Sequence, residues 1–323
     1  MIYVALPDER QYRLPFYLAM EEYIAREFPA QSYFFMWQVQ PTVIFGRNQL
    51  IDSEVDIDYC LSHGIEFYRR KSGGGCVYAD KSNIMLSYIT PETNVNFTFN
   101  KYMLMVEHAL QRLGLDAKST GRNDILLNGK KISGNAFYHL PKRSIVHGTM
   151  LYDTNLEHMA RAITPSDLKL KSKGVESVRQ HVTTLNRYLS IGIEDFKTYL
   201  RTALCNESVV LTPDDIRAIE VIEREYYNPQ FVYGNNPQYS VLKSIRVEGV
   251  GELHACIDIK NDFIENVVLS GDYLSLGDSS AMLDMLKGVR YNRDAVEAAL
   301  QQVECGSYIM NLRKDEFINL LFN

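Results

Sequence analysis

The sequence predicts an α+β protein made of a large mixed α/β domain and a small α+β domain. Its 323 residues are enough for about two domains of ordinary size. Segments with helical spacing alternate with short strand-like runs on both sides of a stretch rich in Asn, Pro and Gly at residues 228–236. We therefore place a linker in that stretch and expect domains at residues 1–240 and 241–323.

The expected large domain begins with a helix at residues 14–28, where apolar residues recur at helical spacing and stop at Pro29. A second helix fits residues 98–113 and is followed by Gly114, a common residue just beyond a helix end. Short apolar runs predict strands at residues 34–37, 42–45, 65–70, 84–90 and 145–152.

A β-hairpin is expected at residues 124–137. Asn128-Gly129 lies there between two alternating runs, and this dipeptide favours a type I′ turn. Pairing outward from the turn places Asp124 opposite Ser133, and these two side chains would then share a face with Lys131. The sequence thus predicts that a carboxylate, a hydroxyl and an ammonium group converge.

The remaining elements follow the same signals. A helix is expected at residues 194–204, and another after Thr212-Pro213, because Thr caps helices and Pro suits the first turn. The small domain should hold a hairpin around residues 260–263. Its other expected elements are strands at 241–250, 252–259 and 264–270 and helices at 279–286 and 293–303.

Composition excludes several protein classes. Hydrophobic residues make up 46% and charged residues 23%, and the net charge of −6 argues against a general nucleic-acid binder. No apolar run approaches the roughly 18 residues of a membrane span. Five cysteines without a CxxC pair exclude a disulfide scaffold and a Cys-rich zinc site, and histidines without HExxH spacing argue against a catalytic zinc site. We expect a soluble cytoplasmic protein with neither nucleic acid nor membrane as partner.

Basic residues are concentrated in three glycine-containing segments at 63–81, 118–147 and 167–187. Any one of them is typical of a solvated surface, but three in an otherwise acidic chain favour a site for an anionic ligand. In the first segment, Arg70 precedes three glycines at 73–75. Such a run lets backbone N–H groups approach phosphate oxygens, although it matches neither a Walker loop nor GxGxxG and is equally compatible with a flexible turn.

Lys131 is the leading candidate in the second segment. A lysine on a strand usually reaches into solvent, but this one is followed by the small residues Ser133 and Gly134. Small side chains beside it would leave room for a bulky ligand. This favours a functional role for Lys131 over a solvated one.

These motifs together resemble the lipoate–protein ligases, a family that shares its fold with biotin ligases and octanoyl transferases. The resemblance is collinear from about residue 14 to 190, and residues 241–323 resemble the accessory domain of two-domain ligases. One departure is that family members commonly close the glycine loop with His-Asp, where this chain has Ala79-Asp80. The matching pieces are Ala19-x-Glu21-Glu22, Pro41-Thr42-Val43-Ile44-x-Gly46-Arg47-x-Gln49, Arg70-x-Ser72-Gly73-Gly74-Gly75-x-Val77, Gly121-Arg122-Asn123-Asp124, Lys131-x-Ser133-Gly134-x-Ala136, His147-Gly148-Thr149 and Lys173-Gly174-Val175-x-Ser177-Val178.

The resemblance implies a catalytic domain of the biotin/lipoate ligase type and a small C-terminal accessory domain needed for activation. It implies ATP-dependent activation of (R)-lipoate to lipoyl-AMP, with Mg²⁺ at ligands that the sequence does not place. The lipoyl group then passes to a lysine of the lipoyl domains of 2-oxoacid dehydrogenases or of the glycine-cleavage H protein. The sequence does not indicate the preferred acyl chain, the acceptor or the oligomeric state.

The site residues follow from the same resemblance. Lys131 is expected to be catalytic, as the cation between the acyl carbonyl and the phosphate. The expected ATP-binding residues are Arg70, Gly75, Cys76, Val77, Tyr78, Asn123, Asp124 and Lys131. The expected lipoate-binding residues are Arg70, Gly74, Gly75, Lys131, Ser133 and His147. Side chains that would line the lipoyl tail, or belong to the core, are Trp37, Phe45, Val77 and Tyr78.

Two other functions remain open. An ATP-independent lipoyl or octanoyl transferase would need a cysteine nucleophile, for which Cys76 is the candidate, although a lone cysteine is more often a small apolar residue. A non-catalytic protein that binds a lipoyl group or a nucleotide is compatible with the departure at Ala79. The retention of Lys131 and of both glycine-containing motifs favours the enzyme.

Overall fold

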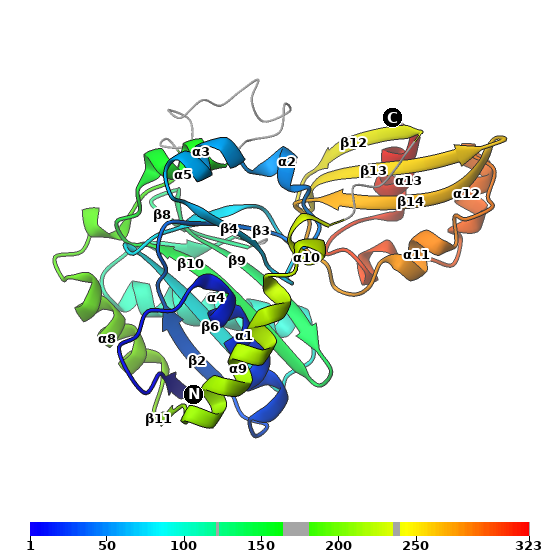
Figure 1. Ribbon diagram of the computed structural model, residues 1–323. Helices are drawn as coiled ribbons and strands as arrows, with labels where there is room; N and C mark the ends of the chain where they lie inside the picture. The colour runs from blue at the N-terminus through cyan, green and yellow to red at the C-terminus, as the bar shows by residue number, and fades with distance from the viewer. Residues whose placement is uncertain (121–122, 164–180, 235–239, 323) are drawn as a thin grey trace. The chain divides into compact units, whose positions relative to one another are not determined.

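The computed structural model describes residues 1–120, 123–163, 181–234 and 240–322 (Figure 1). The chain forms two compact units. Unit 1 comprises Met1–Phe45, Ile51–Arg70 and Cys76–Val232. Unit 2 comprises Gly46–Leu50, Lys71–Gly75 and Tyr233–Asn323. Two short loops from the first part of the sequence, 46–50 and 71–75, therefore group with the C-terminal residues.

Unit 1 is built on an eight-stranded sheet with the strand order β11-β1-β2-β6-β10-β9-β8-β7. Strand β1 pairs in parallel with β2 and β11, and the other neighbours are antiparallel. The strands are β1 (Ile2–Ala5), β2 (Tyr33–Trp37), β6 (Asn83–Thr90), β7 (Ala117–Ser119), β8 (Asp124–Leu127), β9 (Lys130–Leu140), β10 (Arg143–Leu151) and β11 (Glu207–Val210).

A three-stranded sheet in the order β4-β3-β5 completes the strands of unit 1. Its central strand is parallel to β4 and antiparallel to β5. The strands are β3 (Thr42–Phe45), β4 (Glu66–Arg69) and β5 (Val77–Ala79). The short helices α2 (Ile51–Glu54), α3 (Ile57–Ser62) and α5 (Leu156–Ala162) supply residues to the apolar cluster on this sheet.

Longer helices cover both faces of the large sheet. They are α1 (Leu14–Glu27), α4 (Val95–Arg112), α8 (Ile193–Leu204) and α9 (Pro213–Tyr226), with a 3₁₀ turn at η1 (Leu185–Arg187). Ile89 on β6 belongs to the core cluster formed with α1 and α9. Its neighbour Tyr88 stacks on Tyr102 of α4, with ring centroids 6.0 Å apart. Because successive strand residues point to opposite faces, α1 and α4 lie on opposite sides of the sheet.

Helix boundaries follow the sequence signals. Helix α1 starts at Leu14 and ends before Pro29, as predicted. Gly114 follows α4 with φ +81°, a conformation that glycine adopts without the strain of a side chain. Thr212 and Asp215 form a reciprocal capping box at the start of α9, which confirms the predicted cap.

Unit 2 contains a three-stranded antiparallel sheet in the order β12-β13-β14. Its elements are β12 (Val241–Val247), β13 (Gly251–Lys260), β14 (Phe263–Gly271), α11 (Ser280–Asp284), α12 (Arg293–Ala299), η2 (Cys305–Ser307) and α13 (Lys314–Phe322). The hairpin turn at Asn261 and Asp262 has φ +51° and +68°, as the predicted turn requires. Helix α13 was not predicted, and it buries Phe317, Leu320 and Leu321 in this unit's core.

Part of the expected linker is helical. Residues 229–233 form α10 (Pro229–Tyr233), and the side chain of Val232 is buried in the cluster on the small sheet of unit 1. The Arg69 Nε atom donates to the carbonyl oxygens of Phe231 and Val232, at 2.8 and 3.1 Å. A cation that binds the last carbonyls of a short helix stabilises its C-terminal end. Residues 235 and 236 of the expected linker lie outside the described residues.

Two further features concern the cysteines and the helices of the chain. The five cysteines are free thiols. Within the described ranges, no helix combines the length and the apolar character needed to cross a bilayer.

The β9–β10 ladder contains a position that tolerates only glycine. Gly148 pairs with Asn135, and an ideal Cβ at Gly148 would lie 1.8 Å from Oδ1 of Asn135. The Asn135 amide nitrogen donates to the carbonyl of Asn123 and to the Ser133 hydroxyl, at 3.0 and 3.1 Å. A side chain at 148 would therefore displace the residue that ties β9 to the segment before β8.

We expect Gly148→Ala to lower the free energy of unfolding by about 1–3 kcal/mol, the usual cost of forcing extra volume into a packed position. Chemical denaturation followed by circular dichroism measures this value. The matched control is Gly192→Ala, because among the described residues no atom lies within 4 Å of the added Cβ. Equal stability of Gly148→Ala and wild type would contradict the arrangement of Asn135.

Candidate functional site

The β8–β9 hairpin carries the main candidate residues. Its turn residues Asn128 and Gly129 have φ +51° and +76°, as a type I′ turn requires. Near the turn the register is regular, with Leu126 opposite Lys131. The register then shifts, so that Asp124 pairs with Gly134. The predicted pairing of Asp124 with Ser133 is therefore wrong, because a β-bulge adds one residue to β9.

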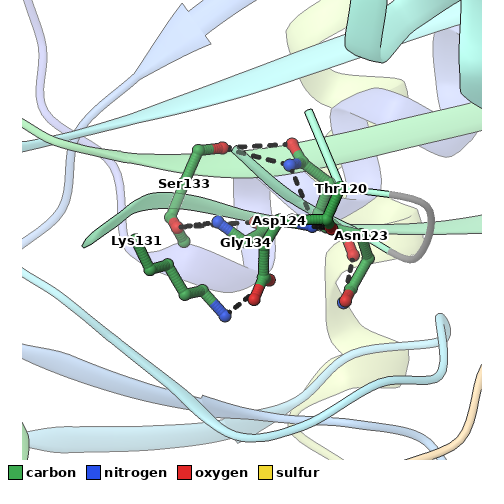
Figure 2. Close-up of polar contacts among 8 residues, drawn as sticks. Thr120, Asn123, Asp124, Lys131, Ser133 and Gly134 are labelled. Carbon is green, nitrogen blue, oxygen red and sulfur yellow. Dashed lines mark hydrogen bonds and ion pairs between the residues drawn. The ribbon is translucent and has the colours of Figure 1, made fainter. Parts of the chain in front are cut away.

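The Lys131 side chain extends along β9 to Gly134 and points toward Asp124 (Figure 2). Its Nζ atom lies 2.8 Å from Oδ1 of Asp124, with side chains 37% and 30% exposed. An ideal Cβ at Gly134 would lie 2.9 Å from the same Nζ. The space beside Lys131, which the sequence suggested for a ligand, is therefore occupied by the lysine side chain in this structure.

Ser133 does not converge with the ion pair. Its side chain is fully buried, and its hydroxyl accepts a hydrogen bond from the Asn135 amide at 3.1 Å. The bulge accounts for this, because it brings Gly134 rather than Ser133 beside Asp124. Ser133 therefore supports the hairpin from inside the protein.

The segment before β8 is tied down by reciprocal bonds (Figure 2). Nδ2 of Asn123 donates to the carbonyl of Asn135, and Nδ2 of Asn135 donates to the carbonyl of Asn123, both at 3.0 Å. The backbone N–H of Asp124 donates to the hydroxyl of Thr120 at 3.1 Å. The Asn123 amide, expected at the nucleotide, makes a structural bond here. Residues 121–122 and the motif beginning at residue 173 lie outside the described residues.

Strand β10 holds Gly134 from the other side. The Gly134 N–H donates to the Thr149 hydroxyl at 3.2 Å, and that hydroxyl lies 3.4 Å from the Gly134 carbonyl oxygen. The backbone beneath the Lys131 side chain is therefore bonded to its neighbours on both sides.

His147, an expected lipoate contact, belongs to a buried polar network. Its Nδ1 atom lies 3.0 and 2.9 Å from the two carboxylate oxygens of Glu21. Glu21 also accepts a bond from the Ser87 hydroxyl at 2.6 Å, and Ser87 accepts one from the Trp37 indole N–H at 2.8 Å. Glu21 is fully buried, and its place in this network was not predicted from the sequence. The available signal was a pair of adjacent carboxylates, Glu21 and Glu22, in the predominantly apolar part of helix α1.

Arg70 is also buried. Its side chain is 5% exposed, and Nη1 donates to the carbonyl of Ile44 at 3.0 Å. Burial lowers the pKa of the Arg70 guanidinium to about 10. The group therefore keeps its positive charge at neutral pH, as a contact for an anion requires.

The residues after the glycine loop differ in exposure. Val77 and Cys76 are partly exposed, whereas Tyr78 is 2% exposed and packs in the same cluster as Phe45. Burial raises the pKa of the Tyr78 hydroxyl. Tyr78, Phe45 and Trp37 are thus core residues in this structure.

The glycine loop is held within unit 2. The Gly74 N–H donates to the carbonyl of Tyr273 at 2.9 Å, with Gly74 at φ +86°. An ideal Cβ at Gly73 would lie 2.6 Å from that carbonyl oxygen, whereas at Gly75 the nearest described atom would be Cβ of Asp272, at 3.7 Å. Close packing thus explains why residue 73 is a glycine, and the positive φ explains why residue 74 is one. Neither reason applies to Gly75.

Comparison with known families agrees with this architecture. The profile of the lipoyl protein ligase A/B catalytic domain matches residues 14–205, and that of the bacterial lipoate protein ligase C-terminus matches residues 236–321. The chain belongs to the lipoate–protein ligase family. It is 33% identical to lipoate-protein ligase LplJ of Bacillus subtilis, over 94% of this chain and 96% of that protein. It is 34% identical to lipoate–protein ligase 1 of Staphylococcus aureus, over 94% and 95%.

Solved structures confirm the predicted fold class. P. falciparum LipL1 in complex with lipoate has a TM-score of 0.77 at 19% identity, covering 99% of this chain and 97% of that one. A lipoate-protein ligase A bound with ATP has a TM-score of 0.63 at 23% identity, covering 72% of this chain and 98% of that one. The large mixed sheet and the small C-terminal sheet thus belong to the ligase fold.

The three loop glycines should respond differently to a methyl group. We expect Gly73→Ala to lower the free energy of unfolding by about 1–3 kcal/mol, because the Tyr273 carbonyl must move. Gly75→Ala, whose Cβ meets only an ordinary contact, is the matched control and should unfold like wild type. Thermal and denaturant unfolding compare the two variants, and equal losses would contradict the close approach at Gly73.

Proposed function

We propose that this chain uses ATP to join lipoate to a lysine of an acceptor protein through lipoyl-AMP. The observation that carries the proposal is the partly exposed Lys131 ammonium, held 2.8 Å from Asp124 on a bonded hairpin. The relatives named as lipoate–protein ligases support the overall reaction. Similar folds that bind lipoate and ATP support the two substrates.

The first half-reaction brings two anions together. A carboxylate oxygen of lipoate attacks the α-phosphorus of ATP, the bond to pyrophosphate breaks, and lipoyl-AMP forms. Fixed cations and preorganised donors lower the cost of this approach, because they stabilise the charge that develops in the transition state. Lys131 supplies the mobile cation, and Arg70 supplies a buried one that remains protonated at neutral pH.

In the second half-reaction, the neutral ε-amine of the acceptor lysine attacks the acyl carbon, AMP leaves, and one proton is released. Lys131 would stabilise the acyl oxygen during this step. The acceptor class is proposed to be lipoyl domains of dehydrogenase E2 subunits or the glycine-cleavage H protein. A similar archaeal ligase, with a TM-score of 0.64 at 24% identity, was solved in a system that includes its E2 lipoyl domain.

The proposed nucleotide contacts are the backbone of Gly75 and its neighbours together with Asp124. Among the described residues, no group of three His, Cys, Asp or Glu side chains is arranged to hold a metal ion. Mg²⁺ usually binds through substrate phosphates and one or two carboxylates, and Asp124 is the candidate carboxylate. Bound Mg²⁺ would supply neutralisation of the phosphate charge.

The division of labour between domains is part of the proposal. We assign catalysis to residues 1–240 and an accessory role in activation to residues 241–323. The two family profiles, which match residues 14–205 and 236–321, support this assignment.

Lys131→Ala should reduce lipoate-dependent pyrophosphate release from ATP on the order of 10²–10³-fold, the usual effect of deleting a principal charge-stabilising donor. Lys130→Ala is the matched control, because its exposed side chain lies one residue away. Both variants should unfold like wild type. Formation of lipoyl-AMP by Lys131→Ala at the wild-type rate would remove the assigned role, and absence of lipoate-dependent pyrophosphate release from wild type would favour a non-catalytic binder.

A transferase remains the second candidate because Cys76, beside the glycine loop, is partly exposed. By contrast, burial raises the pKa of Cys60 to about 11, which makes that thiol a poor nucleophile. We expect Cys76→Ser to retain ATP-dependent ligation, since serine keeps the volume but is a far weaker nucleophile. Mass spectrometry of an acceptor domain measures ligation. An acyl-thioester trapped on Cys76, with activity lost in the serine variant, would favour the transferase.

A further inference from the structure

We propose that Gly134 is a positioning residue whose missing side chain lets Lys131 rest across strand β9 against Asp124. In the resting site the ammonium is then neutralised by Asp124, and an anionic ligand takes the place of that carboxylate. The inference concerns the resting geometry of the hairpin, and its catalytic consequence rests on the proposed function.

The first step is that the Lys131–Asp124 pair explains why residue 134 has no side chain. Among the described residues, the three atoms nearest to an ideal Cβ at Gly134 are Nζ and Cε of Lys131, at 2.9 and 3.0 Å, and Oδ1 of Asp124, at 3.9 Å. The φ angle of Gly134 is also not positive. Its backbone conformation is therefore open to any L-amino acid, and only the lysine side chain is in the way of a methyl group.

The second step is that the backbone cannot yield in place of the lysine. Both the N–H and the carbonyl of Gly134 face the Thr149 hydroxyl, at 3.2 and 3.4 Å. The next residue, Asn135, bonds through its own N–H to the carbonyl of Asn123 at 2.9 Å. A methyl group at position 134 would therefore push the flexible Lys131 chain away from Asp124 and leave the strand in place.

The third step concerns exchange of the partner. The two side chains are 37% and 30% exposed, so water competes with the pair and its net strength is modest. A carboxylate or phosphate can therefore replace Asp124 at small cost, whereas a deeply buried pair would resist exchange. Asp124 keeps the ammonium over β9 until the ligand arrives, which reduces the conformational freedom that binding must remove.

The resting geometry can be tested without any activity. Brief acetylation of the ligand-free protein with acetic anhydride, followed by mass spectrometry of peptides, gives the rate at Lys131 relative to the exposed Lys130. We expect Asp124→Asn and Gly134→Ala each to raise this ratio about two- to fivefold, the range expected for releasing an exposed ion pair. Gly192→Ala is the control glycine and should leave the ratio unchanged.

A second measurement separates positioning from general damage. Gly134→Ala should lower kcat/KM for lipoate-dependent pyrophosphate release about tenfold, since small displacements of a positioned group reduce rate strongly. In a Lys131→Ala background the same change should have no further effect, because it acts through the lysine.

The possible outcomes distinguish the two proposals. An unchanged Lys131 labelling ratio in both Asp124→Asn and Gly134→Ala overturns the resting geometry, whatever the enzyme does. A further loss from Gly134→Ala in the Lys131→Ala background overturns the positioning role, because the glycine then acts through another group. Absence of lipoate-dependent pyrophosphate release from wild type removes the proposed function alone, and the labelling ratio still decides the geometry.

Discussion

The site depends on the β-bulge in β9. Because Leu126 pairs with Lys131 while Asp124 pairs with Gly134, the hairpin contains one extra residue on that strand. Without the bulge, a regular register would place Asp124 opposite Ser133. With it, the carboxylate faces an open position that the Lys131 side chain fills, at 2.8 Å between Nζ and Oδ1. Bulges commonly redirect side chains at functional sites, and this one brings the candidate cation and its carboxylate partner together.

The bulge is in turn held by contacts from distant parts of the chain. The carbonyl of Lys131 accepts a bond from the N–H of Thr183 at 3.0 Å. On the other side, Thr149 bonds to Gly134, and Gly148 leaves space for the Asn135 side chain. Hydrogen bonds therefore hold the hairpin backbone in place, while the long Lys131 side chain on it is partly exposed. A fixed backbone with a movable side chain suits an ammonium group that first rests against Asp124 and then binds an anionic ligand.

A buried polar network lies next to these contacts, because His147 precedes Gly148 on β10. Glu21, fully buried in α1, binds His147 and Ser87, and Ser87 binds Trp37. An unpaired carboxylate in this position would cost several kcal/mol, so its partners are required for stability. The network also determines which imidazole nitrogen of His147 is engaged, because Nδ1 faces the carboxylate. His147 is thus oriented by the core in which it is embedded.

The sequence by itself determined many of the helices and strands, and it determined the family. Local signals were sufficient for helix α1, for the capping box at Thr212 and for the type I′ turn at Asn128-Gly129, since each depends on residues close together in the chain. The order of motifs from residue 14 onward was sufficient for the ligase resemblance, which the family profiles confirmed. Lys131, Asp124 and the glycine loop were all named as candidates from the same motifs.

Only the tertiary structure decided how these candidates are arranged. A two-residue turn sets the register next to it, but the bulge further along β9 depends on Thr149 and Thr183, which no local pattern connects to Lys131. The bulge also explains two differences from the prediction. Ser133 was expected at the site but is buried, and Gly134 was expected to leave room for a ligand but instead accommodates the Lys131 side chain. Spacing along the sequence predicts which residues share a strand, whereas long-range hydrogen bonds decide which atoms meet.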